Sequence, residues 1–345
     1  MPEVSVIVPV KNAVAHLASL REQCEGLTGA SDLEVVVVDD GSDDGSSEVL
    51  RSWADDSALD LRVIQGSGRG VAAARNLAVD EARGEYVWFT DADDQWSPDI
   101  VSILLAAARR TDADLVVANA RKVGVDGEYL GEISDAPETA TATGADAMDR
   151  LLVGTLQGHL WNKLVRHSVL GAAPFPPTRA HSDLGGLLGV LSRCTTVAFE
   201  AREVYTYVIR PGSILNSRGY RWRDLPDCLD LARQAGRGRV AEASLEVFAT
   251  NQVALPLFHE SVRRQAVLDG SDVRAMRAYA RSLITGRSTL RALRGGHRGA
   301  AARAVGVKVA SAPYAALYRR YRVRRYAALD AAASERSTRR RESST

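Results

Sequence analysis

Cysteine is scarce in this sequence, with only three residues in a chain of 345. Cys24, Cys194 and Cys228 lie far apart and form no CxxC pair. Zinc sites and disulfide scaffolds both need paired or patterned cysteines, so the sequence argues against either one. We expect three buried thiols.

Long apolar runs are also missing. A helix that crosses a bilayer needs about 20 predominantly apolar residues, and the best candidate, 240–258, is interrupted by Glu242, Glu246, Asn251 and Gln252. The N-terminus enters an apolar run at Val4 without a basic leader or a small-residue cleavage site, which is unlike an export signal. We therefore expect no membrane span and a cytoplasmic protein.

The sequence has almost no net charge, +1 at pH 7, but its charges are segregated. Residues 287–345 hold 15 Lys and Arg against 3 Asp and Glu, whereas the rest of the chain holds 29 against 40. Apolar residues make up 46% of the chain, which is enough for a sizeable core. We expect an acidic folded body followed by a basic tail.

The first 120 residues alternate short apolar runs with helical patterns. The predicted strands are Val4–Val10, Leu33–Asp40, Leu61–Gln65, Glu85–Thr90 and Asp114–Ala118, and the predicted helices are Ala13–Glu25, Ser46–Ala54, Val71–Ala82 and Pro98–Arg110. Apolar strands that alternate with helices predict an α/β fold, in which a mainly parallel, Rossmann-like sheet has helices on both faces.

The pattern is less regular after residue 121. The Thr- and Ala-rich stretch Thr139–Gly144 suggests a loop or linker, and Thr196–Phe199 and Val204–Ile209 suggest two further strands. From residue 218 the sequence is almost wholly helical. We expect a catalytic-type domain over 1–217, a helical region over 218–333 and a disordered tail over 334–345.

Polar side chains follow three of the predicted strands. The first strand is followed by Pro9, Lys11 and Asn12, the second by Asp39, Asp40, Gly41 and Ser42, and the fourth by Asp91, Asp93 and Asp94. Open α/β sheets bind ligands beyond the carboxyl ends of their strands. We therefore expect these clusters to meet at one edge of the sheet.

The acidic cluster Asp91-Ala92-Asp93-Asp94 directly follows an apolar strand. Carboxylates so close together repel one another, and a hard divalent cation such as Mg²⁺ or Mn²⁺ relieves that repulsion while phosphate oxygens complete its coordination. An Asx-rich turn before the helix that begins near Pro98 explains the same residues. The motif alone leaves both interpretations open.

Two glycine-containing turns suggest nucleotide contacts. Asp40, before Gly41, could accept a hydrogen bond from a base or a ribose hydroxyl, although a turn that caps the next helix also fits. The segment Gly66–Asn76 feeds glycines into a helix, where backbone N–H groups attract anions and where Arg75 and Asn76 could hold phosphate or a base. It lacks the Lys-Ser/Thr pair of a P-loop.

Together these motifs resemble family 2 glycosyltransferases of the GT-A fold. The matching segments are Val4–Asn12 for VSVIVPxxN, Val38–Asp44 for xVDDGSxD, Gly70–Asn76 for GxxxARN and Gly84–Asp94 for GEYxxFxDxDD. Four matches in the right order within residues 3–120 are specific. Two further segments, Trp161–Arg166 and Tyr205–Ile214, resemble those of the bacterial polysaccharide or cell-wall type.

The resemblance assigns roles to the matching positions. Pro9, Asp40 and Arg75 would line the base pocket, Asp91 would contact the ribose, and Asp93 would bind the metal, with Asp94 as a substitute. Asn12 and Asn76 complete the expected donor site. The cofactor implied is Mn²⁺ or Mg²⁺.

A second set of motifs points to the acceptor. Trp161-Asn162-Lys163-Leu164 resembles a WNKL segment of the bacterial members, and we place Trp161, Asn162, Lys163 and His181 on the acceptor side. Those members carry a Glu-Asp pair whose Asp is the catalytic base. Asp183 matches this Asp, whereas Ser182 replaces the Glu. A purely structural role for His181 is the alternative.

The expected activity is an inverting transfer of a sugar from a nucleotide-diphosphate sugar, by default a UDP-sugar, to an acceptor hydroxyl. Asp183 would take the proton from that hydroxyl, and the acceptor would be a glycan or a lipid-linked glycan of the bacterial surface. A catalytically degenerate domain that only binds nucleotide is the alternative, suggested by Ser182. An enzyme that synthesises nucleotide sugars would need a glycine-rich basic loop in place of Val10–Ala13.

The basic tail combines arginines with an apolar stripe. Near helical spacing relates Tyr314, Leu317, Tyr318, Tyr321, Ala328 and Leu329, and Arg319, Arg320, Arg322, Arg324 and Arg325 surround them. Such a helix fits the surface of an anionic bilayer, here the inner face of the plasma membrane, or packs its stripe on the rest of the protein. The acidic body argues against nucleic acid as a partner.

Overall fold

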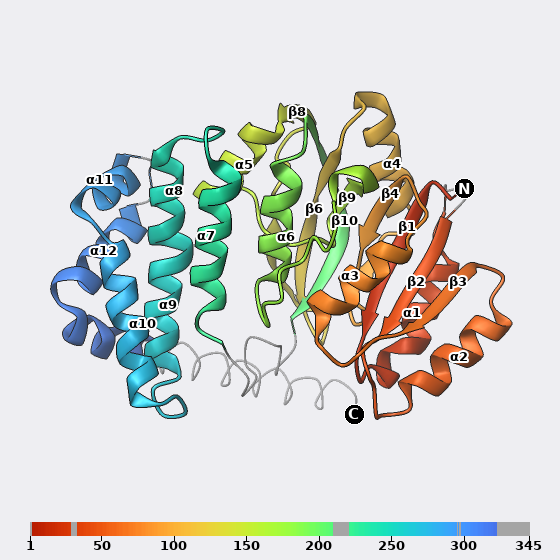
Figure 1. Cartoon of the computed structure of the whole chain (residues 1–345), viewed down its shortest axis with the longest axis horizontal. Coiled ribbons are helices and arrows are strands. Elements are labelled where there is room, and N and C mark those ends of the chain that lie inside the picture. Colours follow the sequence, from red (N-terminus) through yellow and green to blue (C-terminus); the bar gives the residue numbers. More distant parts are fainter. Residues whose placement is uncertain (1, 29–32, 210–220, 295, 297, 323–345) are drawn as a thin grey trace, which may run out of the picture. The chain divides into compact units, whose positions relative to one another are not determined.

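The computed structural model describes residues 2–28, 33–209, 221–294, 296 and 298–322 (Figure 1). They form two compact units, residues 1–241 and 242–345. The domain boundary predicted near Ser217 lies outside the described residues, as does the predicted tail over 334–345. Helix α7 (Asp224–Gly236) falls in the first unit.

The first unit is built on a ten-stranded sheet with the order β3-β2-β1-β4-β9-β6-β10-β5, in which β7 pairs with β6 and β8 with β10. The strands are β1 (Val4–Val10), β2 (Leu33–Asp39), β3 (Asp60–Gln65), β4 (Tyr86–Phe89), β5 (Gln95–Trp96), β6 (Leu115–Gly124), β7 (Tyr129–Ile133), β8 (Ala140–Thr143), β9 (Lys163–Arg166) and β10 (Thr196–Ile209). The predicted α/β class is confirmed.

The two halves of this sheet differ in strand direction. Strands β1 to β4 pair only in parallel with one another, as the alternation of strands and helices predicts. In the other half β9 runs antiparallel to both β4 and β6, while β6 and β10 are parallel. The sheet is therefore mixed rather than mainly parallel.

Helices cover both faces of the first half. They are α1 (Val14–Glu25), α2 (Ser46–Asp56), α3 (Val71–Glu81) and α4 (Ile100–Thr111), followed further along by α5 (Gly144–Val153) and α6 (Ser182–Leu191). Strand side chains alternate between faces. Val4, Val6 and Val8 therefore face the core cluster that includes α1 and α4, and α3 packs against β1 and β2.

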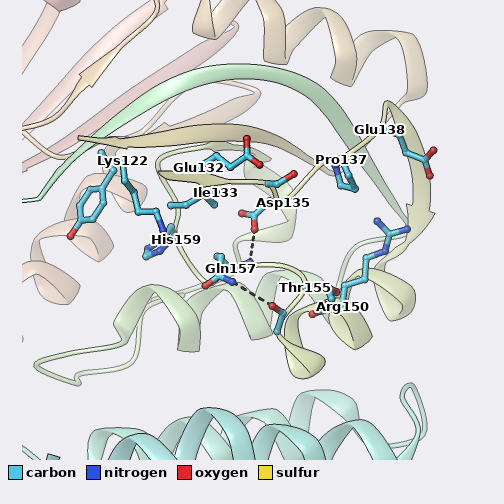
Figure 2. Close-up of a pocket in the computed structure, with 13 residues that line it drawn as sticks. Lys122, Glu132, Ile133, Asp135, Pro137, Glu138, Arg150, Thr155, Gln157 and His159 are labelled. Carbon is cyan, nitrogen blue, oxygen red and sulfur yellow. Dashed lines mark hydrogen bonds between the residues drawn. The ribbon is translucent and has the colours of Figure 1, made fainter. Parts of the chain in front are cut away.

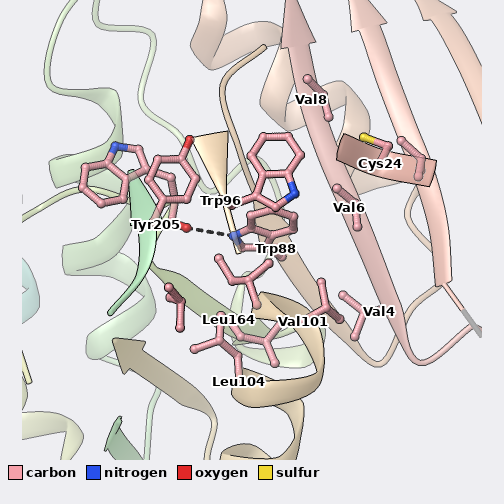
Figure 3. Packing of buried hydrophobic residues seen from close by; sticks show 14 of the residues in the cluster. Val4, Val6, Val8, Cys24, Trp88, Trp96, Val101, Leu104, Leu164 and Tyr205 are labelled. Atoms are coloured by element: carbon pink, nitrogen blue, oxygen red, sulfur yellow. Dashed lines mark hydrogen bonds between the residues drawn. The ribbon is translucent and has the colours of Figure 1, made fainter. Parts of the chain in front are cut away.

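Large aromatic side chains fill the middle of this core (Figure 3). Trp88 meets Trp96 edge to face at 5.2 Å, and its indole N–H donates to the carbonyl of Trp161 at 2.8 Å. Tyr205 of β10 stacks on Trp161 at 4.6 Å. Because these residues come from β4, β5, β10 and the segment before β9, the stack joins the two halves of the sheet.

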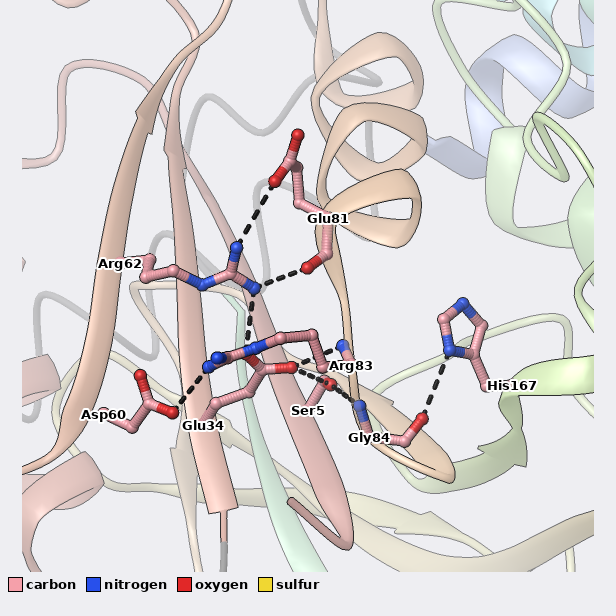
Figure 4. Close-up of polar contacts among 8 residues, drawn as sticks. All are labelled: Ser5, Glu34, Asp60, Arg62, Glu81, Arg83, Gly84 and His167. Atoms are coloured by element: carbon pink, nitrogen blue, oxygen red, sulfur yellow. Dashed lines mark hydrogen bonds and ion pairs between the residues drawn. The ribbon is translucent and has the colours of Figure 1, made fainter. Parts of the chain in front are cut away.

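A buried carboxylate fixes the amino ends of the parallel strands (Figure 4). Glu34 of β2 is fully buried and accepts hydrogen bonds from Ser5, from Arg62 and from both the backbone and the guanidinium of Arg83. Burial alone would raise the pKa of Glu34, but these donors outweigh it and lower the pKa to about 2. The carboxylate links β1, β2 and β3 to the turn before β4.

The prediction of a loop at Thr139–Gly144 is wrong. Residues 140–143 form β8, which pairs antiparallel with the first part of β10. Thr143 then caps α5, because its hydroxyl accepts from the Asp146 backbone and the Asp146 carboxylate bonds back to Thr143. The side chains of β8 alternate between partly buried and exposed, as expected for an edge strand. They are also small, which is why the sequence of this strand resembles a linker.

The two strands predicted at 196–199 and 204–209 are one strand. β10 runs through both segments, and its register against β6 shifts between Glu200 and Glu203 and again between Glu203 and Tyr205. A β-bulge of this kind bends a strand without ending it. The polar bulge residues explain why the sequence suggests a break.

The second unit is helical, in agreement with the predicted character of the region. Its elements are α8 (Glu242–Phe248), the π-helix η3 (Ala249–Ala254), α9 (Leu255–Arg263), α10 (Gly270–Leu283), α11 (Gly286–Arg294) and α12 (Arg298–Val309), and residues 311–322 are also helical. Among the described residues, no helix combines the length and apolarity required to cross a membrane.

All three cysteines are buried and unpaired, as predicted. Burial raises the pKa of each thiol to about 12. Such thiols are protonated at neutral pH and have little nucleophilic character.

Candidate active site

The first half of the site lies directly after β4. Asp91 is partly exposed, and its carboxylate pairs at 3.0 Å with the buried guanidinium of Arg75 from α3. Burial raises the pKa of Asp91, Arg75 opposes that shift, and the nearby carboxylates of Asp93 and Asp183 add to it. The structure therefore brings together three acids that are up to 92 positions apart in the sequence.

Asp93 and Asp94, which the sequence leaves as alternative metal ligands, have different environments. Asp94 is buried, and its two oxygens accept from the Tyr205 hydroxyl at 3.0 Å and from the Val208 backbone at 2.9 Å. Burial, with a contribution from Asp91, raises its pKa to about 8. Asp94 thus anchors β10, whereas Asp93 stays partly exposed. This difference in exposure favours Asp93 over Asp94 as the metal ligand.

The second half of the site lies at the end of β2. Asp40 is buried, with one carboxylate oxygen bonded to the Gly70 backbone N–H at 2.6 Å. Its other oxygen, Oδ1, is buried and has no hydrogen-bond partner. Buried polar atoms are normally satisfied. An N–H or O–H group of a ligand would supply the missing donor.

The same helix contacts both acids. The turn before α3 reaches Asp40 through Gly70, and Arg75 one turn later reaches Asp91. Strand β1 lies between β2 and β4, so the two strand ends are separated by two inter-strand spacings, about 10 Å. Helix α3 begins directly after Gly70, and its first backbone N–H groups form the positive end of the helix dipole.

Asn12 and Pro9 lie at the end of β1, beside the Asp40 turn. Asn12 has a left-handed backbone (φ 52°), and its backbone and side chain bond to Ser42 and Asp43. Lys11 donates to the Asp40 carbonyl at 3.0 Å. Pro9 is partly exposed. Asn12 therefore holds the two strand-end loops together, and direct donor contact by Asn12 or Pro9 stays a prediction.

The loop that carries Asp183 is fixed by two distant residues. The side-chain amide of Asn76 makes two hydrogen bonds to the Phe175 backbone, both at 2.9 Å. The buried carboxylate of Asp224, at the start of α7, accepts from the backbone of Arg179 and Ala180. Because both ends of its amide are used in this way, Asn76 anchors this loop, and its contact with the donor stays a prediction.

Asp183 is the second residue of α6. Its carboxylate is partly exposed and accepts from the Leu184 backbone at 3.1 Å, at the end of the helix where negative charge is favoured. His181 precedes it in the left-handed region (φ 63°), and the Cys228 thiol lies 3.6 Å from its carbonyl oxygen. The backbone of His181 thus turns the chain into α6, and acceptor contact by its ring stays a prediction.

For Asn162 and Lys163, contact with an acceptor stays a prediction, and the structure gives both side chains partners within the protein. Both side chains are fully buried. Lys163 pairs with the buried Asp135 at 3.2 Å and donates to Asn162 at 2.7 Å, while Asn162 also bonds to Asp135 and to the Ala118 carbonyl. Burial lowers the pKa of Lys163 despite Asp135. These buried contacts of Asn162 and Lys163 stabilise the start of β9.

Trp161 is buried too, but it belongs to an aromatic stack that reaches the surface. His159 and Tyr207, both partly exposed, stack on it at 4.8 and 5.6 Å with nearly parallel rings. Burial lowers the pKa of His159, and the carboxylate of Asp183 acts against this shift. His159 and Tyr207 therefore present the exposed rings of this stack, and contact of Trp161 with an acceptor stays a prediction.

The acids suit a divalent cation that is shared with a substrate. Within the described residues, no group of three or more His, Cys, Asp or Glu side chains has the geometry to hold a metal by itself. Mg²⁺ in nucleotide sites is typically bound by one or two carboxylates together with phosphate oxygens. Asp93, next to Asp91, can supply that smaller set.

Several site residues could not be found from the sequence. Phe175, Asp224, His159 and Tyr207 contribute through long-range contacts and belong to none of the motifs at the strand ends. Asp135 is also unmarked in the sequence, because its role as partner of Lys163 appears only when β7 and β9 lie in one sheet.

The fold and the site together indicate a class of protein domain. An α/β domain with acids after β2 and β4, a glycine turn that leads into α3, and a further acid at the start of α6 has the organisation of the GT-A domains. Residues 5–168 match the sequence model of Glycosyl transferase family 2. Over residues 5–168 the chain is therefore similar to family 2 glycosyltransferases, and its architecture is that of a GT-A domain.

Curated relatives agree with this assignment. The chain is 30% identical to the EpsH protein of Bacillus subtilis over 182 residues, which cover 50% of this chain and 49% of EpsH. It is 25% identical to the cholesterol galactosyltransferase of Borreliella burgdorferi over 62% of each chain, and 26% identical to the glycosyltransferase GlyG of Streptococcus pneumoniae over 62% of this chain and 73% of GlyG. The chain thus spans about half of EpsH and less than two thirds of the galactosyltransferase.

The fold extends beyond the matched segment. A crystal structure of TarS 1–349 from S. aureus in complex with UDP-GlcNAc superimposes with a TM-score of 0.68 and 20% sequence identity. The alignment covers 93% of this chain and 91% of that one. Its coverage includes both units, so the helical second unit is part of the shared architecture.

Proposed function

We propose that this protein is an inverting glycosyltransferase that moves a sugar from a nucleotide-diphosphate donor to an acceptor hydroxyl in bacterial surface glycan synthesis. The observation that carries the proposal is the pairing of Asp91, directly after β4, with Arg75 of α3, near the carboxylates of Asp93 and Asp183. The resemblance to family 2 and the bacterial relatives support the class of substrate.

The donor is placed by Asp40 and by the acids after β4. The unpartnered oxygen of Asp40 would accept from the base, and Asp91 would accept from the ribose about 10 Å away across β1. That span suits a nucleoside. A UDP-sugar is the proposed donor, and UDP-GlcNAc, the ligand in the TarS crystal structure, is the choice for a first test.

The chemistry is a single displacement. The acceptor oxygen attacks the anomeric carbon from the face opposite the diphosphate, the bond from that carbon to the phosphate oxygen breaks, and its electron pair leaves with the diphosphate. Asp183 removes the acceptor proton as the new bond forms. The N-terminus of α3 favours negative charge on the departing diphosphate.

A divalent cation, Mn²⁺ or Mg²⁺, would be held by Asp93 together with the donor phosphates, and it would act as a Lewis acid on the leaving group. Asp91 stays paired with Arg75, which restrains the orientation of its carboxylate. Asp94 is committed to β10 and is not needed as a ligand.

We also propose that the helix at 311–322 contacts an anionic membrane surface. Tyr314 and Tyr318 of the predicted stripe pack on His259 of their own unit, whereas Leu317 and Tyr321 are exposed beside Arg319 and Arg320. The predicted continuation through Arg324, Arg325, Ala328 and Leu329 lies outside the described residues. A lipid-linked acceptor would make such contact useful.

Substitution of the two central acids tests the activity. Asp183→Asn removes the proton acceptor but keeps the shape of the side chain, so we expect transfer to fall at least 100-fold while UDP still raises the melting temperature in the presence of Mn²⁺. Asp93→Asn should abolish the dependence of that rise on Mn²⁺. The measurements are UDP-GlcNAc turnover and thermal shift with and without Mn²⁺.

The matched control is Asp227→Asn, an exposed acid in the first turn of α7. It should behave as the unmodified protein. Full transfer activity in Asp183→Asn would reject Asp183 as the base. Nucleotide binding without any turnover of the donor by the unmodified chain would favour the degenerate, nucleotide-binding alternative.

A further inference from the structure

A pocket of about 650 Å³ lies beside the acid cluster, within the first unit (Figure 2). Its walls come from β6 and β7, the segment after β7, the segment between α5 and β9, and Tyr207 of β10. This volume lies within the range of small-molecule binding sites. None of the strand-end motifs contributes a residue to it.

The pocket adjoins the acid cluster through the aromatic stack. His159 and Tyr207 line the pocket, and both rings stack on the buried Trp161. Burial raises the pKa of Tyr207, and the carboxylates of Asp94, Asp91, Asp93 and Asp183 raise it further. Val208, the residue after Tyr207, donates its backbone N–H to Asp94 at 2.9 Å, so this wall of the pocket lies next to the acids that follow β4.

The lining is polar and apolar in equal parts, and its charges are nearly balanced. Lys122 and Arg150 face Glu132 and Glu138, and the third acid, Asp135, is already paired with Lys163. A polyanionic ligand such as a phosphate polymer would require an excess of cations. Hydroxyl groups are instead well matched to a lining of mixed donors and acceptors.

The shape of the pocket favours a chain rather than a single ring. Figure 2 places Lys122 and His159 at one end, and Glu138 and Arg150 at the other. A linear ligand would extend along this line. An aromatic face at the near end provides a flat apolar surface for the C–H face of a sugar ring.

We propose that this pocket binds an uncharged oligosaccharide portion of the acceptor and positions its end at Asp183. The proposal rests on the proposed function, which it deepens by naming the acceptor class. Tyr207 is the wall shared by the pocket and the acid cluster, and Asp135 with Lys163 forms the rigid floor.

Binding of free saccharides tests the proposal without a known acceptor. The probes are mono-, di- and trisaccharides of glucose, galactose and N-acetylglucosamine, with tripolyphosphate as an anionic comparison, measured by calorimetry on the full chain with UDP and Mn²⁺ present. We expect at least one trisaccharide to bind ten or more times more tightly than its monosaccharide. Failure of every saccharide to bind, or preferential binding of tripolyphosphate, would overturn the proposal.

A bulky substitution places the binding in this pocket. Ser134 is exposed on the lining, so Ser134→Trp should fill the space and weaken trisaccharide binding at least tenfold. Val125→Trp adds the same indole at an exposed turn outside the lining and should change nothing. Unchanged trisaccharide binding by Ser134→Trp would show that the saccharide binds elsewhere.

Two substitutions at Tyr207 separate stacking from hydrogen bonding. Tyr207→Phe keeps the ring on Trp161 and should keep most of the affinity, whereas Tyr207→Ala should lose at least tenfold. Equal binding by the two variants contradicts the role of the ring. UDP binding and donor hydrolysis are measured on the same samples. Loss of both would contradict the proposed function, whereas loss of saccharide binding alone would contradict only the proposal for this pocket.

Discussion

At the residue scale, the oxygens of Asp40 differ in what they contact. Oδ2 is held by the Gly70 backbone, and Oδ1 is buried without a partner. Gly66 lies directly against the second oxygen, because a Cβ at that position would be 2.9 Å from Asp40 Oδ1 and 3.0 Å from its Cα. The glycine therefore leaves room for the carboxylate in its present position.

Gly66→Ala should weaken donor binding. The added methyl would displace the Asp40 carboxylate, so we expect the affinity for UDP to fall about tenfold, together with a loss of about 1–3 kcal/mol in stability from overpacking. Calorimetric titration with UDP and thermal unfolding measure the two effects. Gly286→Ala is the control, because a Cβ there meets nothing within 4 Å. UDP binding by Gly66→Ala at the unmodified affinity would contradict the placement of the base at Asp40.

The sequence predicts which acids matter better than it predicts their partners. The motif order identifies Asp40, Asp91, Asp93 and Asp183, and the structure brings the last three close together. The sequence cannot separate Asp93 from Asp94, because burial of Asp94 depends on β10, more than 100 residues later. The burial of Lys163 depends in the same way on its distant partner Asp135.

At the element scale, the parallel half of the sheet is joined at its amino ends by the carboxylate of Glu34. Its pKa of about 2 lies below the ordinary value of 4.5. The unfolded chain therefore binds a proton at higher pH than the folded chain does. Stability from Glu34 is complete above about pH 5 and is lost as the pH falls from about 4.5 toward 2.

Glu34→Gln should lower stability at neutral pH by about 1–3 kcal/mol, because hydrogen bonds to a charged acceptor are lost. The difference from the unmodified protein should shrink as the pH falls from 5 to 3. Denaturant unfolding at several pH values measures it. Glu48→Gln is the control, since its ion pair with Arg51 is exposed and contributes little. A difference that stays constant from pH 7 to pH 3 would refute the assignment.

Element prediction succeeds where the pattern is local. β1 has the predicted bounds, and the other predicted strands and helices of the first 120 residues lie close to theirs, except that β6 continues to Gly124, past the predicted end at Ala118. It fails at β8 and at the middle of β10, where pairing with a distant strand decides the conformation. The antiparallel position of β9 likewise depends on both of its neighbours and has no local signal.

At the scale of the whole molecule, the last part of the chain carries an excess of basic residues, and the acidic body carries the candidate site. Leu317 and Tyr321 are 65% and 53% exposed on the helix at 311–322, beside Arg319 and Arg320. Apolar side chains beside arginines can enter the interfacial region of an anionic bilayer.

We expect the full chain to co-sediment with phosphatidylglycerol vesicles and not with phosphatidylcholine vesicles. Each basic residue near an anionic surface contributes about 1 kcal/mol. A double substitution, Leu317→Ser with Tyr321→Ser, should lower the bound fraction several-fold. Val267→Ser, at a residue that is 78% exposed outside this helix, serves as the control. Equal sedimentation of the double variant and the unmodified chain would exclude this helix as the contact.

Two adjacent residues of α3 serve different halves of the active site. Arg75 holds the acid after β4, and Asn76 holds the loop that leads to Asp183. A tilt of this helix would move Asp91, on the proposed donor side, and the loop before Asp183, the proposed base, at the same time. Adaptation to a larger or smaller donor through α3 would therefore also realign the nucleophile, so selectivity for the two substrates should evolve jointly in this chain.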